Sequence, residues 1–173
     1  MKGEIDMPAR MLLICIVAFV VATTPPPRAA HYVHRSGVVL PDPAATPGEV
    51  DPDLTAAKLC SAKFHTGSVR DVTESQKKRI CEAYGQKDCP GRGYEIDHLV
   101  SIELGGANTD ANLWPQPVDA AGVIGFHTKD VVENRLHALV CKGKLDLAEA
   151  QNCIADDWYE CAQQWNILPE KEK

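Results

Sequence analysis

Apolar and polar positions alternate along the second half of the chain with the period of amphipathic helices. Over residues 129–141 one stripe of apolar residues recurs at helical spacing and ends before Lys142-Gly143-Lys144. The residues of this stripe are Val132, Leu136, Leu139 and Val140. A second helix is predicted after Asp146, which suits a helix N-cap. Its apolar face consists of Leu147, Ala150, Ile154, Trp158 and Cys161.

Two shorter helices are predicted upstream. Residues 54–64 have a helical pattern, with Thr55 available as the N-cap. Thr73 begins the next helix, because Gln76 stands three residues later and the two form a capping box. This helix is expected to end near Tyr84-Gly85, where glycine suits the C-cap.

Between these helical regions the pattern changes to that of a hairpin. Residues 94–102 are extended, with β-branched and apolar side chains, and Gly105-Gly106 provide a tight reversal. Residues 111–114 form the expected return strand, which Pro115 and Pro117 should stop. Helices, hairpin and helices follow one another in the sequence, so the predicted fold class is α+β.

The N-terminal third has a different composition. Residues 11–22, "MLLICIVAFVVA", are apolar but shorter than the roughly 20 residues of a membrane-spanning helix. They suit a signal peptide over 1–22, with an uncleaved anchor as the alternative. Residues 23–53 are rich in proline and lack apolar periodicity, which predicts a disordered leader. The folded domain is therefore expected over 54–168.

The cysteines support export. Of the seven cysteines, Cys15 lies in the apolar leader, and an even number remains in the folded part: Cys60, Cys81, Cys89, Cys141, Cys153 and Cys161. Such a set in an exported domain predicts a disulfide framework and a secreted or periplasmic protein. A zinc cluster is the alternative, but the chain has no CxxC pair.

The net charge of −6 does not suit a protein that binds nucleic acid through phosphate neutralisation. Residues 56–92 nevertheless contain more basic than acidic side chains. If this segment lies beside the hairpin, it provides a phosphate-binding track. An ordinary solvated helix face is an equally good interpretation of the same residues.

The hairpin sequence "YEIDHLVSIELGGANTDANLWPQP", residues 94–117, contains the candidate chemistry. Asp97 and His98 are adjacent on a strand, so their side chains point to opposite faces and are not hydrogen-bond partners. This arrangement does not favour a nucleophile–histidine relay. It suits a carboxylate that holds a metal ion and an imidazole that acts on water.

The segments "YEIDHLVSIELGG", "NLWPQP" and "KDVVENRLHALVC" resemble the HNH endonucleases of the ββα-metal (His-Me finger) class, and among them exported bacterial HNH-like proteins. The resemblance covers about 94–160. It implies a small, disulfide-stapled helical domain built around a ββα-metal hairpin–helix motif. It also implies that Cys60 pairs with Cys141.

The resemblance assigns roles to individual residues. His98 matches the general base, and Asp97 matches the metal-binding carboxylate. Asn112 matches the asparagine that ties the hairpin loop together and helps to hold the histidine. His127 is the best match for the second metal ligand, although its spacing from Asn112 departs from the family pattern.

Further expectations concern the start of the following helix. Asp130 is an alternative metal ligand, and Lys129 is expected to contact phosphate. His137 is a further alternative metal ligand because it is also a histidine, but it lies ten residues beyond His127. At 1.5 Å per residue this is roughly 15 Å along the helix, too far for a shared ion.

The implied activity is metal-dependent hydrolysis of phosphodiester bonds in nucleic acid, with DNA as the expected substrate. One divalent ion is implied, Mg²⁺ or Mn²⁺, with Zn²⁺ or Ni²⁺ as further options. No stable membrane association is expected after signal cleavage, and the oligomeric state stays open. Two alternatives remain: a non-enzymatic, disulfide-stabilised binding or structural module, and a structural zinc site at Asp97, His98 and His127.

Overall fold

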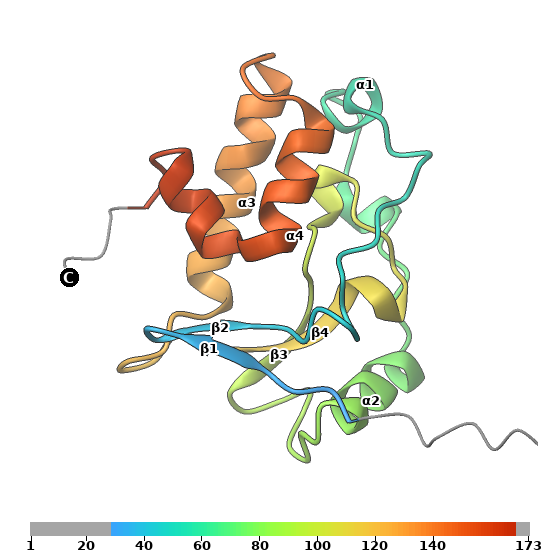
Figure 1. Ribbon diagram of the computed structural model, residues 1–173. Coiled ribbons are helices and arrows are strands. Elements are labelled where there is room, and N and C mark those ends of the chain that lie inside the picture. Colours follow the sequence, from blue (N-terminus) through green and yellow to red (C-terminus); the bar gives the residue numbers. More distant parts are fainter. Residues whose placement is uncertain (1–28, 169–173) are drawn as a thin grey trace, which may run out of the picture.

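The computed structural model describes residues 29–168 and has a mixed α+β fold (Figure 1). Within that range it contains four α-helices and two separate antiparallel hairpins. The strands are β1 (Val33–Arg35), β2 (Val38–Leu40), β3 (Tyr94–His98) and β4 (Leu113–Pro117). The helices are α1 (Ala56–Leu59), α2 (Glu74–Ala83), α3 (Phe126–Cys141) and α4 (Leu147–Gln164). The α+β prediction is confirmed at this level.

The β3–β4 hairpin pairs Asp97 with Trp114, and β4 continues through both prolines that were expected to stop it. Leu99 N donates to Asn112 O, and Val118 N donates to Gly93 O. Because bonded and non-bonded pairs alternate along an antiparallel ladder, Pro115 and Pro117 fall at non-bonded positions. Their missing N–H groups are not needed there, so the predicted end of the strand was wrong.

Helices α3 and α4 pack against each other and form the larger part of the core. The apolar stripes predicted for both helices are confirmed: Val132, Leu136, Ile154 and Trp158 are buried. Asp146 caps α4 by accepting hydrogen bonds from the backbone N–H groups of its first turn. Figure 1 shows the two helices side by side above the hairpins.

Helix α3 begins at Phe126, three residues before the predicted start at 129. Its N-cap residue, Gly125, has no side chain, and Asp119 provides the cap from a preceding loop. The Asp119 carboxylate accepts hydrogen bonds from Gly125 N at 3.0 Å and from Thr128 N at 3.2 Å. The extra turn brings His127 and Lys129 into the first turn of the helix.

The two short helices follow the predicted positions only in part. Thr73 Oγ1 accepts a hydrogen bond from Gln76 N and caps α2, as expected. The Gln76 side chain does not complete the capping box but donates to Asn108 O at 2.7 Å. The helix predicted over 54–64 is reduced to α1, and the side chain of Thr55 forms no cap hydrogen bond.

The prediction of a disordered leader over 23–53 is wrong for the described part of that range. Residues 33–40 form the β1–β2 hairpin, and Val38, Val39 and Leu40 are buried. The hairpin is anchored by a long-range contact, because Ile124 N donates to Gly37 O at 2.8 Å. The predicted signal peptide, 1–22, lies outside the described residues.

Three disulfides connect the six cysteines of the folded part: Cys60–Cys141, Cys81–Cys89 and Cys153–Cys161. The predicted framework and the Cys60–Cys141 pairing are confirmed. The long-range disulfide joins the end of α1 to the end of α3. Three disulfides indicate an oxidising, extracellular or periplasmic environment. Over residues 29–168, no helix is both long and apolar enough to cross a membrane.

Candidate active site

Asp97 and His98 lie at the end of β3 and make their contacts on different sides of the strand. The carboxylate of Asp97 faces α3, where Lys129 Nζ lies 2.9 Å from Asp97 Oδ2. The ring of His98 faces the loop, where its Nε2 lies 3.1 Å from Asn108 Oδ1. The alternation of side chains along the strand thus separates the two groups as predicted.

Asn112 connects the two ends of the loop between β3 and β4. Its Oδ1 accepts a hydrogen bond from Val100 N, and its Nδ2 donates to Val100 O and Ala107 O, all at 2.9 Å. The side chain is fully buried. These contacts are those expected of a residue that ties the hairpin loop together.

The loop also requires glycine next to Asn112. A Cβ atom at Gly106 would lie 1.7 Å from Val100 O and 2.7 Å from Asn112 Nδ2. No larger residue fits this approach without moving the backbone. The preceding Gly105 has φ +82°, the left-handed conformation that glycine adopts without strain. The two glycines are therefore needed for different reasons. Gly105 adopts a positive φ, and Gly106 allows the close approach to Val100 O.

The side chain that contacts the His98 ring is that of Asn108, and not that of Asn112 as expected. Besides contacting His98, Asn108 donates from Nδ2 to Val69 O at 2.8 Å. The imidazole is thereby linked to the segment that precedes α2. The sequence contained no signal that distinguished Asn108 from an ordinary loop residue, because its partner Val69 is distant along the chain.

The ring of His98 is buried, with 1% of its surface exposed. Burial lowers the pKa of His98 to about 4, although Asn108 and Asp97 act in the opposite direction. The imidazole is therefore neutral at pH 7. Its Nδ1 is also buried and has no hydrogen-bond partner among the described residues. A neutral ring with an available nitrogen has the protonation state that a general base needs.

Lys129 does not lie where a phosphate ligand is expected, and that prediction is corrected. Its side chain has no exposed surface. The ammonium group donates to Asp97 Oδ2 and to His98 O at 2.7 Å, and it forms an ion pair with Glu133. An ammonium has three N–H donors, and all three are used by these acceptors. A phosphate cannot reach this group without displacing one of them.

Lys129 and the acidic side chains beside it shift one another's pKa values. Burial alone would lower the pKa of Lys129, but the negative charges of Asp97 and Glu133 outweigh it and raise the pKa. Burial raises the pKa of Glu133, and the charge of Asp97 adds to this while Lys129 opposes it. Lys129 is therefore charged and pairs with Asp97, while the pKa of Glu133 is raised to about 8. Glu133 is a member of this site that the sequence interpretation missed.

The other predicted ligands lie on the exposed side of the same region. His127 and Asp130, both in the first turns of α3, are exposed. Burial raises the pKa of Asp130, and the nearby charge of Asp97 raises it further while His127 lowers it. Burial raises the pKa of Glu95 in the same way, with contributions from Asp97 and Asp130. Three carboxylates and an imidazole thus surround the end of β3 and the start of α3.

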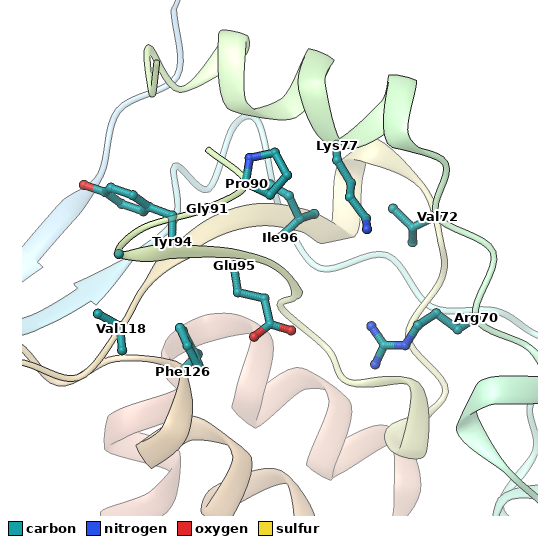
Figure 2. Close-up of a pocket in the computed structure, with 11 residues that line it drawn as sticks. Arg70, Val72, Lys77, Pro90, Gly91, Tyr94, Glu95, Ile96, Val118 and Phe126 are labelled. Carbon is teal, nitrogen blue, oxygen red and sulfur yellow. The ribbon is translucent and has the colours of Figure 1, made fainter. Parts of the chain in front are cut away.

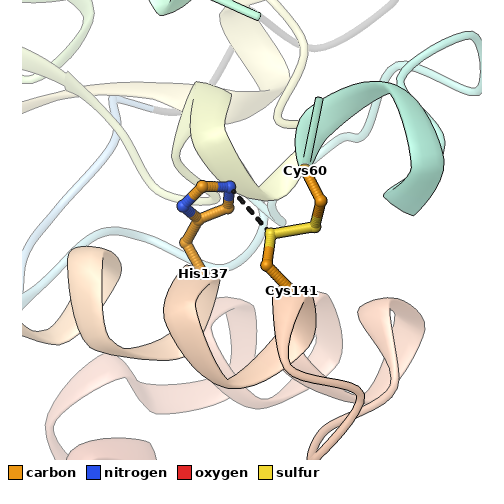
Figure 3. A group of neighbouring side chains, drawn as sticks. All are labelled: Cys60, His137 and Cys141. Carbon is orange, nitrogen blue, oxygen red and sulfur yellow. Dashed lines mark hydrogen bonds between the residues drawn. A yellow bond between two sulfur atoms is a disulfide. The ribbon is translucent and has the colours of Figure 1, made fainter. Parts of the chain in front are cut away.

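His137 lies in a different environment, as expected from its position on α3. Its Nε2 is 3.3 Å from Cys141 Sγ, and its Nδ1 is 3.8 Å from Glu103 Oε2 (Figure 3). Among the described residues, Cys60, His137 and Cys141 are the one group of three such side chains with ligand atoms within 4.8 Å of one another. The two sulfur atoms are bonded to each other, so they are not metal ligands in the oxidised protein.

The basic segment 56–92 lies beside the hairpin, since α2 contacts both β3 and β4. Part of its charge is used within the protein. Arg79 forms a bidentate pair with Asp110, with both distances 2.9 Å. Arg70 and Lys77, in contrast, line an open hollow next to Glu95 (Figure 2).

No family model, curated protein or solved structure matches this chain.

Proposed function

We propose that the protein is a metal-dependent nuclease that hydrolyses phosphodiester bonds, with His98 as general base. The observation that carries the proposal is the local arrangement at the end of β3. Asp97 and the neutral His98 are followed by the loop whose two ends Asn112 connects. The first turns of α3 face the Asp97 carboxylate. These contacts support the roles that the resemblance to HNH endonucleases implies for Asp97, His98 and Asn112.

The residues present are of the right chemical type for a hard divalent cation. Asp97 and His127 would hold it, and Asp130 offers a further carboxylate from the same turn of α3. Lys129 contacts only Oδ2 of Asp97, so the second oxygen of that carboxylate is not used by the lysine. When bound, the cation supplies a Lewis acid for the phosphate oxygens.

His98 would take a proton from the attacking water. Its low pKa keeps the ring unprotonated at neutral pH. Because His98 is almost fully buried, water and substrate reach its ring only after the residues around it rearrange.

A second candidate function, a non-enzymatic exported module, has one specific observation in its favour. Lys129 already provides a positive charge to Asp97 and Glu133. A protein that keeps the hairpin for stability alone would gain from such an internal cation. Under this interpretation Asp97 and His98 are structural residues.

Cleavage of supercoiled plasmid separates the two functions. The mature protein, from about residue 23, is incubated with plasmid and Mg²⁺ or Mn²⁺, and in parallel with EDTA. Nicking that requires the cation and falls by about 10²–10⁴-fold in His98→Gln supports the nuclease. His34→Ala, which changes an exposed histidine on β1, is the matched control.

Full activity of His98→Gln would show that His98 is not the base. Absence of cleavage of both plasmid and single-stranded DNA, with either ion and with a folded protein, would favour the non-enzymatic module. Circular dichroism and the thermal transition of each variant establish that the protein is folded.

A further inference from the structure

A hollow of about 650 Å³ lies beside β3, between α2, the segment before it and the start of α3 (Figure 2). Clefts of roughly 300–1,000 Å³ are typical of small-molecule sites, and a single nucleotide is a ligand of this size. The lining combines charged and aromatic side chains, among them Arg70, Lys77, Tyr94, Glu95 and Phe126.

The basic and the aromatic side chains lie at different ends of the hollow. Figure 2 shows Arg70 and Lys77 at one end, Phe126 at the other, and the Glu95 carboxylate between them. The ring of Tyr94 points away from Glu95 and stacks on that of Tyr32, with 6.5 Å between their centroids. The Arg70 side chain forms no ion pair or hydrogen bond with any other described residue. Lys77 pairs only with Glu74, whose side chain is 82% exposed, and such surface pairs are weak. Both cations are therefore available to an anionic ligand.

The hollow adjoins the proposed catalytic residues. Glu95 and Asp97 are two residues apart on β3 and point to the same side of the strand. The ring of Phe126 contacts that of His127, with 4.3 Å between their centroids. A ligand that touches Glu95 and Phe126 is therefore next to the two residues that would hold the cation.

The mixed lining restricts the ligand. Inorganic phosphate suits Arg70 and Lys77 but gains nothing from the aromatic end, and the charge of Glu95 repels it. An apolar molecule suits Phe126 but gains nothing from the charges of Arg70 and Lys77. A ligand with a phosphate at one end and a flat ring bearing N–H donors at the other satisfies all of these groups.

We propose that this hollow binds one unstacked nucleotide of a single-stranded nucleic acid, with its phosphate at Arg70 and Lys77 and its base at Phe126 and Glu95. This inference rests on the proposed nuclease function, for which it names the substrate class. Bases in a duplex are stacked and paired, so a duplex must be opened before a base can enter the hollow.

Glu95 gives the hollow a preference among bases. A carboxylate accepts hydrogen bonds but cannot donate them when it is ionised. Guanine offers neighbouring ring N–H and amino donors, whereas thymine offers a single N–H between two carbonyl acceptors. Guanine is therefore expected to bind more tightly than thymine, and Glu95→Gln is expected to reduce the difference.

Binding is measured by titration calorimetry with the wild-type protein in EDTA, so that no hydrolysis occurs. The probes are dGMP, dTMP, inorganic phosphate, and a labelled hexanucleotide as a single strand and as a duplex. We expect dGMP to bind more tightly than dTMP or phosphate, and the single strand more tightly than the duplex. Phe126→Ala should weaken binding of dGMP by roughly five- to a hundredfold, the usual range for loss of a stacking contact.

Lys78→Ala is the matched control for Arg70→Ala and Lys77→Ala. Lys78 is adjacent to Lys77 on α2, is 78% exposed, and lines a different hollow with Glu74 and Glu82. Arg70→Ala and Lys77→Ala should weaken binding of dGMP, whereas Lys78→Ala should not. The inference is overturned if all three variants bind equally, if phosphate binds as tightly as dGMP, or if the duplex binds as tightly as the single strand.

The same variants separate this inference from the proposed nuclease function. Binding of dGMP that depends on Arg70 and Phe126, together with absence of cleavage, supports the hollow and removes the nuclease. Cleavage that depends on His98 but is unaffected by Arg70→Ala and Phe126→Ala supports the nuclease and overturns the nucleotide site.

Discussion

Replacement of Lys129 by methionine tests the buried charge network directly. Methionine has a similar length but no charge, so Asp97 and Glu133 lose the ammonium that they share. Removal of one partner from a buried ion pair typically costs about 3–5 kcal/mol, because an unpaired buried charge remains. Lys129 has no exposed surface, and Glu133 is 8% exposed, so the upper part of this range is expected.

The double variant Lys129→Met/Glu133→Leu gives the second half of the test. Replacing both partners of a buried pair by apolar residues of similar volume is often neutral, so the double variant should be more stable than Lys129→Met alone. Asp97 remains in both proteins and is 14% exposed, so water can solvate it in part.

The free energies of unfolding are obtained from urea titrations followed by tryptophan fluorescence, with the disulfides intact. Trp114 and Trp158 are fully buried and report the loss of both parts of the core. With an m-value of about 2 kcal/mol per molar urea, a loss of 4 kcal/mol lowers the midpoint by about 2 M. A loss below about 1 kcal/mol for Lys129→Met, or a double variant less stable than the single one, would refute the reasoning.

Three further predictions concern the same framework. Asn112→Ala should lower the free energy of unfolding by about 3 kcal/mol or more in a urea titration, because Val100 N, Val100 O and Ala107 O lose their partner; a loss below 1 kcal/mol would contradict this. Cys60→Ser/Cys141→Ser should lower it by about 4.5 kcal/mol, the chain-entropy value for a closed loop of 81 residues, and an unchanged thermal transition would be inconsistent with that disulfide. In EDTA, the difference in free energy of unfolding between wild type and His98→Gln should be constant above about pH 6.5 and should shrink by about 3 kcal/mol towards pH 4. The reason is that, as the pH falls, His98 takes up its proton in the unfolded chain before it does so in the folded protein. A difference independent of pH would exclude the low pKa of His98.

The sequence alone predicted those features that depend on a pattern of side chains within one element. The apolar stripes of α3 and α4 are local patterns, and so are the caps at Thr73 and Asp146. The disulfide framework followed from the number of cysteines. The Cys60–Cys141 pairing came only from the resemblance, because spacing alone leaves many pairings open.

Features that depend on distant partners were not predictable in this way. Residues 33–40 belong to a proline-rich segment without apolar periodicity, and they are ordered because Gly37 and Val38 pair with Ile124. Asn108 holds His98 only because Val69 lies opposite. Lys129 and Glu133 have the spacing of an ordinary surface pair on a helix, and nothing local shows that Asp97 and His98 O lie against Lys129.

If the protein is the nuclease proposed above, the distribution of charge at the end of β3 would separate substrate binding from cleavage. Glu95, Asp97 and Asp130 place three carboxylates where His127 and the start of α3 meet the strand, and Lys129 divides its single charge between Asp97 and Glu133. A scissile phosphate approaching Asp97 therefore meets negative charge that the protein itself does not balance, and a divalent cation would reduce this repulsion. A phosphate at Arg70 and Lys77, as proposed, would meet positive charge and would need no such ion. Binding of a single nucleotide should therefore persist in EDTA, while cleavage should be lost.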